Sequence, residues 1–308
     1  MSKKFYLLVN LKSGADRGTF SYRNTTQILE NNNLAYETIF SKYPGYLTQA
    51  AQQLANDLKL NPNAIIIVIG GDGSLNQVLN GIKRSAYPQT PIAYLPSGTG
   101  DDFARALNLQ YTPQELIAKL NNHPEVKEFD CGYYFNVNTN QEGYFVNNLG
   151  IGFDAYVVAE TNNSNMKKRW GHFSYGINVF KAILNQPAFS VTVKVNDKIH
   201  SFNNAYLVTT TNHPYFGGGV PILPKAKPTN HLLDTIVVEK PSFFKFVYLF
   251  SKMIITKKQI KDPHFHYYGA KEMEVITKDL EYGQLDGEEL GSKNFDLLFH
   301  VDKFNLLL

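Results

Sequence analysis

The fold is decided by residues 64–76, which read AIIIVIGGDGSLN. The branched apolar run at residues 64–69 predicts a β-strand that is buried on both faces. Gly70 and Gly71 follow directly and allow a tight turn that brings the backbone close to a ligand. Ser74 is expected to cap the helix that comes next. Such a turn presents backbone N–H groups to phosphate, although strand–turn–helix units without ligands have the same pattern.

The alternation of strand and helix continues through the first third of the chain. Further strands are predicted at residues 5–10, 36–41 and 91–96, and helices up to about residue 32, at 46–58 and at 101–107. This alternation predicts a parallel sheet, whose ligands bind beyond the carboxyl ends of the strands. Loops of small residues follow three strands, at residues 10–14, 70–74 and 97–102. Their position at one sheet edge is stronger evidence for a ligand site than any single loop.

The pattern changes after about residue 123, where strands become densely spaced. Candidate strands lie at residues 144–148, 189–195, 205–211, 232–239, 264–276 and 295–300, with helical insertions near 170–184 and 242–255. This spacing predicts a mostly antiparallel β-sandwich. We therefore expect an α/β domain over residues 1–124 and a β-rich domain over 125–308, whose last residues can pack back on the first. The active site is expected between the two domains.

Composition narrows the class of protein. The 308 residues are 43% hydrophobic and 19% charged, as in ordinary globular proteins. A net charge of +3 is too small to indicate a nucleic-acid partner. The single cysteine, Cys131, excludes an internal disulfide framework and a cysteine-rich zinc site. Neither a signal peptide nor an apolar stretch of about 20 residues is apparent, so we expect a cytoplasmic protein with at most peripheral membrane contact.

Two sequence blocks carry a resemblance to a known family. GGDGSLNQVLNG (residues 70–81) and PSGTGDDFARAL (96–107) resemble the motifs GGDGT and P-x-GT-x-NDFAR of the diacylglycerol kinase catalytic domain family. NNLGIGFDA (147–155) and LDGE (285–288) resemble two later motifs, so the resemblance covers essentially the whole chain. It implies an NAD kinase/phosphofructokinase-like α/β domain and an ATP-dependent, Mg²⁺-dependent lipid kinase. The P-loop pattern G-x-x-x-x-G-K-[ST] is absent.

The resemblance also implies roles for the matching residues. The implied nucleotide contacts are Asn10, Ser13, Gly14, Ser41, Gly70, Gly71, Asp72, Gly73, Ser74, Asn76 and Thr99. Asp72 is implied to anchor the catalytic Mg²⁺, and Glu288 to activate the lipid hydroxyl, with Asp286 as its orienting residue or a metal partner. Phosphoryl transfer requires these two functions, because phosphate charge must be neutralised and the hydroxyl must lie in line. Taken without the resemblance, the Asp-Gly pair at 286–287 predicts only a β-hairpin turn.

Three positions depart from the family pattern. Ser74 replaces Thr and keeps the hydroxyl. Asp101 replaces Asn, so its charge either weakens nucleotide contacts or caps the following helix. The stretch KPTNHL at residues 227–232 replaces Lys-x-x-Asp-Gly-Leu, which binds a structural Mg²⁺ in soluble bacterial members. A neutral amide is a poor substitute for a carboxylate on a hard cation, so binding of this metal by Lys227, Asn230 and Leu232 is left open.

The lipid side of the site has a weaker sequence signal. Residues 243–255 (FFKFVYLFSKMII) are apolar, with Lys245 and Lys252 inside and three lysines shortly after. They predict either a helix packed on the β domain or one that contacts an anionic membrane surface; residues 167–170 allow the same two interpretations. The expected acceptor is diacylglycerol or another lipid alcohol, such as a sphingoid base, ceramide, phosphatidylglycerol or an undecaprenol-like alcohol. An NAD kinase is a more distant alternative, because it shares GGDG but lacks the block at residues 96–107. A nucleotide-binding homologue without catalysis is the alternative, and exposed strand edges are compatible with a homodimer.

Overall fold

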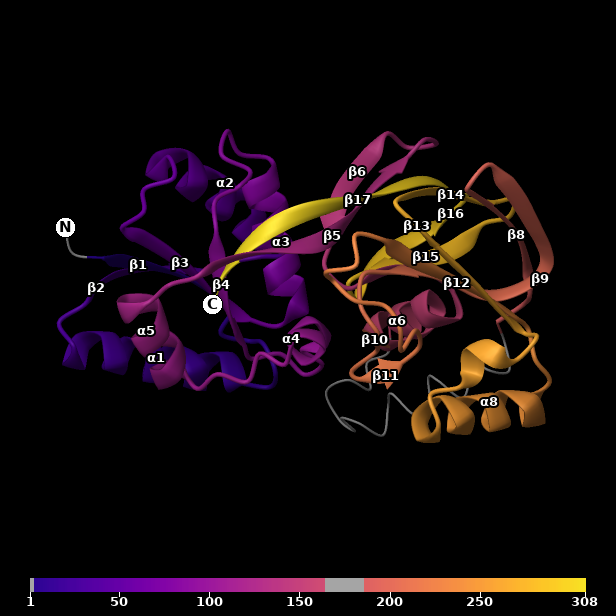
Figure 1. The fold of residues 1–308 in the computed structure, drawn as a ribbon, viewed down its shortest axis with the longest axis horizontal. Helices are drawn as coiled ribbons and strands as arrows, with labels where there is room; N and C mark the ends of the chain where they lie inside the picture. The colour runs from indigo at the N-terminus through magenta and orange to yellow at the C-terminus, as the bar shows by residue number, and fades with distance from the viewer. Residues whose placement is uncertain (1–2, 164–185) are drawn as a thin grey trace. The chain divides into compact units, whose positions relative to one another are not determined.

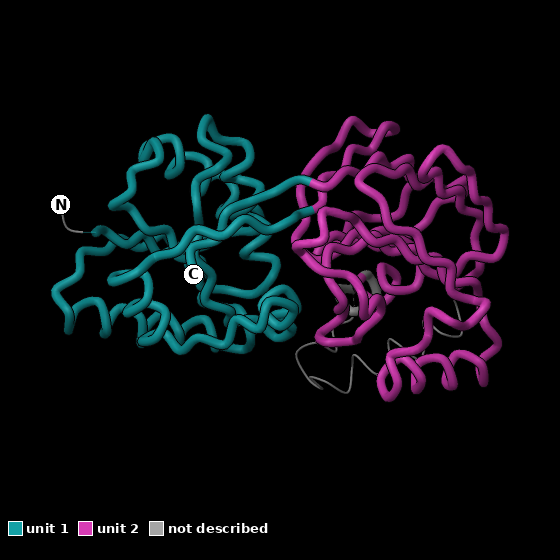
Figure 2. The backbone as a smooth tube through the Cα atoms, in the orientation of Figure 1, with its two compact units in different colours: residues 1–131, 302–308 teal, residues 132–301 magenta. Residues whose placement is uncertain are grey.

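The computed structural model describes residues 3–163 and 186–308, the side chains of 159–163 excepted. The chain divides into two compact units, residues 1–131 with 302–308 and residues 132–301 (Figure 2). Two strands, β5 (Val126–Asn136) and β17 (Asp296–Leu307), run from one unit into the other. The first unit is therefore built from both ends of the described chain.

The first unit is a parallel sheet covered by helices. Its strands are arranged in the order β2–β1–β3–β4–β17, with the elements β1 (Lys4–Val9), β2 (Ala35–Phe40), β3 (Ala64–Gly70), β4 (Ile92–Pro96) and the end of β17. All of these neighbours pair in parallel. Residues 65–69 of β3 are at most 2% exposed, which confirms the predicted strand buried on both faces.

Five helices surround this sheet, namely α1 (Arg17–Asn31), α2 (Tyr46–Leu58), α3 (Asp72–Lys83), α4 (Asp102–Leu107) and α5 (Pro113–Asn122). In Figure 1, α1 and α5 cover one face of the sheet and α2 lies on the other. The sequence patterns did not predict α5. Its signal is nevertheless present, because Thr112 and Glu115 form a reciprocal capping box ahead of the helix.

The second unit is mostly antiparallel. Its main strands are β6 (Gln141–Phe145), β7 (Asn148–Gly152), β8 (Phe189–Val195), β9 (Lys198–Thr211), β12 (Leu233–Glu239), β13 (Phe265–Ala270), β14 (Glu272–Thr277), β15 (Glu281–Leu285) and β16 (Glu288–Lys293), with a small ribbon of β10 (Tyr215–Phe216) and β11 (Val220–Pro221). They pair in the order β16–β15–β7–β9–β8–β14–β17, while β12 joins β9 to β13. This confirms the predicted β-sandwich.

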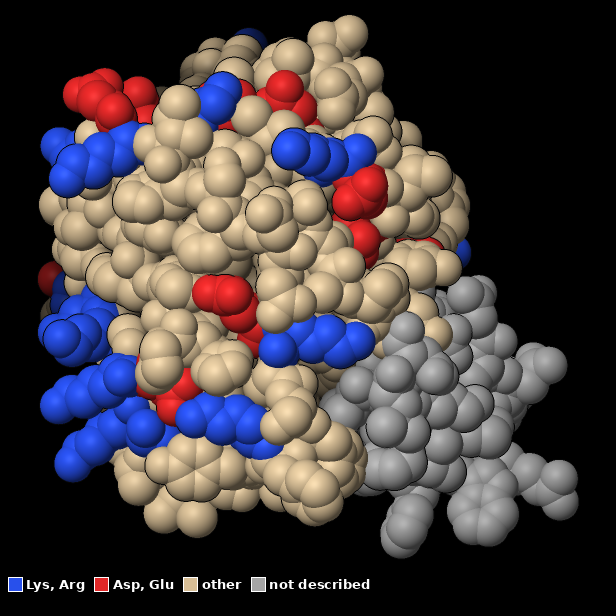
Figure 3. All heavy atoms as spheres, turned by 90° about the vertical axis from the view of Figure 1, so that its right-hand side faces the viewer, with Lys and Arg blue, Asp and Glu red and all other residues tan. Residues whose placement is uncertain are grey.

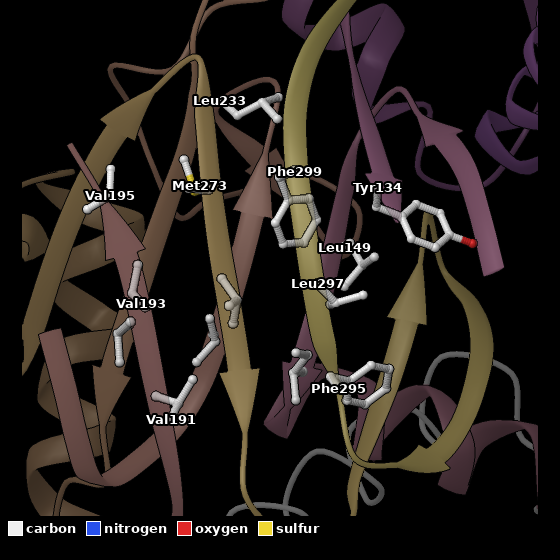
Figure 4. Packing of buried hydrophobic residues seen from close by; sticks show 14 of the residues in the cluster. Tyr134, Leu149, Val191, Val193, Val195, Leu233, Met273, Phe295, Leu297 and Phe299 are labelled. Carbon is white, nitrogen blue, oxygen red and sulfur yellow. The ribbon is translucent and has the colours of Figure 1, made fainter. Parts of the chain in front are cut away.

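The core of the second unit comes from alternating side chains of these strands. Figure 4 shows aromatic and branched residues from several strands packed together, and the largest members of the cluster are Tyr134, Phe145, Phe189, Phe295 and Phe299. The prediction of a single strand over residues 264–276 is wrong. It is two strands interrupted at Lys271, because β13 pairs with β12 whereas β14 pairs with β8 and β17.

Among the described residues of this unit, helical segments interrupt the strands at α6 (Phe153–Asn163), α8 (Phe243–Ile255) and the 3₁₀ helix η2 (Gln259–Lys261). The predicted helix at 242–255 corresponds to α8, and α6 was not predicted. The helix expected near residues 170–184 and the basic residues 167–170 lie outside the described residues. In the part of the chain that the structure describes, no helix is both long and apolar enough to cross a membrane.

Candidate functional site

Three loops of the first unit meet at the carboxyl edge of the parallel sheet. The Asn10 N–H donates to the Ile69 carbonyl (2.9 Å) and the Ser97 N–H donates to the Gly70 carbonyl (2.8 Å). The Asn10 side-chain amide also lies 3.4 Å from the Ser74 Oγ. The loops that follow β1, β3 and β4, each predicted from a run of small residues, therefore form one surface.

Glycine is required at two positions where these loops approach each other closely. A Cβ on Gly98 would lie 2.6 Å from the Gly71 Cα, and a Cβ on Gly14 would lie 2.3 Å from the Ser97 carbonyl oxygen. Gly14 also has a φ of 59°, which disfavours other residues. The backbone itself thus forms this part of the surface, where N–H groups can approach a phosphate closely.

The helix after the opening turn begins earlier than the sequence pattern indicated. α3 starts at Asp72, with Gly71 at the N-cap position, and no side chain caps it. The predicted capping by Ser74 is wrong, because Ser74 lies inside the first turn, 4% exposed, with its hydroxyl facing Asn10. The positive end of the helix dipole consequently lies at the Gly71–Asp72 step.

Asp72 lies among oxygen-bearing groups of the neighbouring loop. Its Oδ2 accepts a hydrogen bond from the Asp102 N–H (2.8 Å). The buried Tyr94 hydroxyl lies 3.5 Å from the Asp72 Oδ1 and 3.4 Å from the Asp101 Oδ1. Burial beside these two carboxylates raises the pKa of Tyr94 well above its ordinary value. Tyr94 therefore stays protonated and donates to the acidic pair.

The side chain of Asp101 turns back toward its own loop. Its Oδ1 accepts from the Gly98 N–H (2.8 Å) and makes no capping hydrogen bond to α4, so the alternative that Asp101 caps the following helix is wrong. The reason is its left-handed backbone, with a φ of 49°, which directs the carboxylate away from the helix. Burial raises the pKa of Asp101, although the Arg17 guanidinium at 3.8 Å opposes the shift.

These groups fit a magnesium ion chemically. Mg²⁺ prefers oxygen ligands and is usually bound by one or two carboxylates together with substrate phosphates. Asp72 would hold the ion, with Asp101 close by. When bound, Mg²⁺ neutralises phosphate charge. A cavity of about 420 Å³ lies beside the same loop and is lined by Thr99, Arg17 and Arg105, and the two arginines are suited to anionic groups.

The other predicted nucleotide residues lie at or near the same sheet edge. Ser41 directly follows β2, and its N–H donates to the Val9 carbonyl (2.8 Å). Ser13 places its Oγ 3.4 Å from the Ser97 Oγ. Asn76 lies in the second turn of α3, where its side chain accepts from the Asn80 amide (3.2 Å). Their contacts with a nucleotide remain a prediction.

The second unit holds the predicted acidic pair on a hairpin. β15 and β16 are joined by Asp286 and Gly287, whose φ values of 49° and 85° give the tight turn that Asp-Gly favours. The Asp286 carboxylate accepts hydrogen bonds from the backbone N–H groups of residues 146, 147 and 148, each at 2.9 Å. Glu288, the first residue of β16, is exposed. The hairpin is thus fixed by Asp286 and presents Glu288.

A buried network that the sequence did not reveal supports this hairpin. The Gln284 amide donates to the Asn148 Oδ1 (2.5 Å) and to the Asp154 Oδ2 (2.8 Å). Its own oxygen accepts from the Gly287 N–H (2.9 Å). Gln284 therefore connects the Asp-Gly turn to β7 and α6.

Asp154 gives the network a distinct pH dependence. Burial raises its pKa to about 6, although the hydrogen bond from Gln284 opposes the shift. Among the described residues, its Oδ1 is buried without a hydrogen-bond partner. Because the folded pKa exceeds the unfolded one, the protonated carboxyl favours folding at low pH, and this contribution is lost as pH rises from about 4 to about 6.

We expect Asp154→Asn to unfold at nearly the same urea concentration as the unmodified chain at pH 4. At pH 7 the variant is expected to be more stable, by up to about 3 kcal/mol, because it carries no buried charge. Urea unfolding between pH 4 and pH 7 measures the difference. Asp197→Asn, at an exposed turn of the same unit, is the control. A stability difference that did not change with pH would contradict this assignment.

His213 is held in one neutral form. It is fully buried, its Nδ1 accepts from the Tyr215 N–H (3.2 Å) and its Nε2 lies 2.7 Å from the Asn147 Oδ1. Burial lowers its pKa to about 3. The proton therefore lies on Nε2, and the histidine positions the same segment that Asp286 binds.

The residues that were considered for a structural metal form hydrogen bonds within the chain instead. The Asn230 Oδ1 accepts from the Leu232 N–H (3.1 Å), and the Asn230 N–H donates to the Lys227 carbonyl (3.2 Å). The side-chain amide of Asn230 faces Asp234 at 3.4 Å. Within residues 3–163 and 186–308, no group of three acidic, histidine or cysteine side chains is placed to hold a metal. These residues fit a structural Mg²⁺ poorly.

Comparison with known proteins gives matches over both units. Residues 4–134 match the diacylglycerol kinase catalytic domain, and residues 147–299 match the YegS C-terminal NAD kinase beta sandwich-like domain. The protein named "Putative lipid kinase YtlR" of Bacillus subtilis (strain 168) is 26% identical over 95% of this chain and 96% of its own. "Putative lipid kinase" of Staphylococcus carnosus (strain TM300) is 26% identical over 83% of this chain and 81% of its own.

Solved structures show the same fold over the whole length. A structure titled "The crystal structure of a diacylglycerol kinases from Bacillus anthracis str. Sterne" has a TM-score of 0.68 at 21% identity, and covers 99% of this chain and 96% of its own. The two domains are those of the diacylglycerol kinase fold, an α/β domain followed by a β-sandwich. The chain belongs to the diacylglycerol kinase family, because the two matched domains together cover most of it, and the relatives it matches are named putative lipid kinases.

Proposed function

We propose that this chain transfers the terminal phosphoryl group of ATP to the hydroxyl of diacylglycerol or a related lipid. The product would be phosphatidic acid or the corresponding lipid phosphate. The observation that carries the proposal is the meeting of three small-residue loops at the sheet edge where α3 begins and Asp72 lies. This is the arrangement of backbone N–H groups, helix dipole and carboxylate that a nucleotide with Mg²⁺ requires.

The nucleotide side of the reaction is assigned to the first unit. The proposed contacts are Asn10, Ser13, Gly14, Ser41, Gly70, Gly71, Asp72, Gly73, Ser74, Asn76 and Thr99. Asp72 would hold the catalytic Mg²⁺. Arg17 and Arg105 border the adjoining cavity, where they lie 3.8 Å from Asp101 and 2.9 Å from Asp102, respectively, and their guanidinium groups would face phosphate charge that has to be balanced.

The acceptor side is assigned to the hairpin of the second unit. The lipid hydroxyl oxygen forms a bond to the γ-phosphorus while the bond from that phosphorus to the ADP oxygen breaks. The hydroxyl proton passes to the Glu288 carboxylate, which lies exposed at the start of β16. Asp286 keeps the turn rigid through its three backbone hydrogen bonds, so it acts as a positioning residue.

A kinase assay with a panel of lipids tests the proposal. Purified protein, Mg-ATP labelled at the γ-phosphate and diacylglycerol in mixed micelles are expected to give labelled phosphatidate, with a known diacylglycerol kinase as the positive control. Parallel reactions contain sphingosine, ceramide or phosphatidylglycerol. Label in one of these alone would replace diacylglycerol as the acceptor. Bound nucleotide without any labelled lipid would indicate a homologue that has lost catalysis.

A further inference from the structure

Helix α8 is attached to the second unit by one face. Leu249 and Met253 are only 4% and 6% exposed. With Phe246 and Phe250 they line a small apolar cavity of about 60 Å³ above the strands. The stacked rings of Phe246 and Phe250 complete this inner face. The packing of α8 therefore agrees with the prediction of a helix packed on the β domain.

The opposite face of α8 is also apolar. Phe244 and Ile255 are 84% and 79% exposed, and Val247 and Tyr248 are 48% and 55% exposed. Helices on the surface of globular domains normally carry polar side chains on their outer face. A contiguous apolar patch of this kind marks a site of interaction with a protein or a membrane.

The charges around this patch are mostly positive, although Lys245 forms an ion pair with Asp262 (2.8 Å). Between residues 242 and 261 there are five lysines and no aspartate or glutamate: Lys245, Lys252, Lys257, Lys258 and Lys261. The amino groups of Lys245 and Lys252 lie 5.3 Å and 5.7 Å from the centre of the Tyr248 ring. The last three lysines follow the helix and are exposed. In the lower part of Figure 3, basic side chains, with some acidic ones between them, gather beside uncharged surface.

We propose that α8 and these five lysines dock the chain on a membrane surface that contains anionic phospholipid. The 13 residues of α8 span about 20 Å, less than the roughly 30 Å of a hydrocarbon core, so the helix would lie in the plane of the interface. Exposed rings and aliphatic side chains enter the headgroup boundary while lysines contact lipid phosphates. The excess of positive charge on this surface disfavours a symmetric contact with a second copy.

This inference rests on the proposed function, because a lipid kinase must reach a substrate that is dissolved in a bilayer. Its test is flotation with vesicles of phosphatidylcholine alone and of equal parts phosphatidylcholine and phosphatidylglycerol. The unmodified chain is expected to bind the anionic vesicles preferentially, and added salt is expected to weaken this binding. Failure to bind the anionic vesicles would overturn the proposal.

Paired variants separate the apolar and charged contributions. Phe244→Ser/Ile255→Ser is expected to lower vesicle affinity by about 10-fold or more. Lys257→Gln/Lys258→Gln is expected to lower binding to anionic vesicles by about 10-fold and to leave binding to phosphatidylcholine unchanged. The matched control is Ile199→Ser on β9, which removes a side chain from a residue that is 69% exposed. Equal binding by all variants would overturn the proposal.

Two further measurements separate this proposal from its alternatives. Turnover of a short-chain, water-soluble diacylglycerol should be unchanged in the α8 variants, whereas turnover of vesicle-bound diacylglycerol should fall. If no lipid is phosphorylated but the α8 variants still lose vesicle binding, the docking surface stands and the proposed function fails. Light scattering measures oligomeric state, and a dimer that the α8 variants convert to monomer would assign the patch to a second copy and overturn membrane docking.

Discussion

Replacing Glu288 with glutamine is expected to lower turnover by about 10²- to 10⁴-fold and to leave nucleotide affinity unchanged. Glutamine has the same shape as glutamate but cannot take the hydroxyl proton. Glu288 directly follows the Asp286-Gly287 turn, so the substitution leaves the hydrogen bonds of that turn in place. Steady-state kinetics with saturating lipid gives turnover, and calorimetric titration gives the affinity for nucleotide.

Glu289 provides the matched control for this experiment. It is the next residue of β16, it is also exposed, and strand geometry directs its side chain to the opposite face. Glu289→Gln removes the same charge from the same strand and is expected to retain turnover. Similar turnover in the two variants would remove Glu288 from its role as the base.

Replacing Asp286 with alanine is expected to destabilise the second unit by about 3 kcal/mol or more, because three backbone N–H groups lose their acceptor. The asparagine variant is expected to lose about 1 to 2 kcal/mol, since its oxygen can still accept from residues 147 and 148. Its amide group would then face the N–H of residue 146, which now donates to the second carboxylate oxygen. Turnover should fall in both variants as Glu288 loses its fixed position.

Urea unfolding measures these differences in stability. Asp279→Ala, at an exposed position shortly before β15, is the control and is expected to change stability by less than about 0.5 kcal/mol. An alanine variant at 286 as stable as this control would show that the three hydrogen bonds do not hold the hairpin. That result would favour the other predicted role of Asp286, that of a metal partner.

Strong local patterns predicted much of the fold. Residues 64–69 indicated a central strand because a parallel strand buried on both faces is apolar throughout, and the loops at its edge followed from small residues after each strand. α6 was missed because its sequence, FDAYVVAETNN, has no clear apolar stripe and the helix depends on packing against β7 and β15. The break at Lys271 was missed because the choice of partner strands, and not local propensity, divides that run.

The candidate site, like the fold, was predicted only where a local sequence pattern indicates it. The loops at residues 10–14, 70–74 and 97–102 were predicted because each contains its own signal. Gln284 and Asp154 were not predicted as partners, since 130 residues separate the two side chains that form the hydrogen bond. The orientation of Asp101 was also missed, because no local pattern indicates its left-handed backbone or its hydrogen bond from the Gly98 N–H.

The return of residues 302–308 to the first unit has a consequence for synthesis of the chain on the ribosome. Leu306 pairs with Ile92 beside β4, and the ring of Phe304 lies 5.8 Å from that of Phe103 in α4. Until these residues emerge, the nascent first unit lacks its last strand and the partner of the helix that follows the Ser97–Asp102 loop. Translation of the entire β-sandwich therefore precedes completion of the first unit, and the small-residue loops of an unfinished chain lack part of their support.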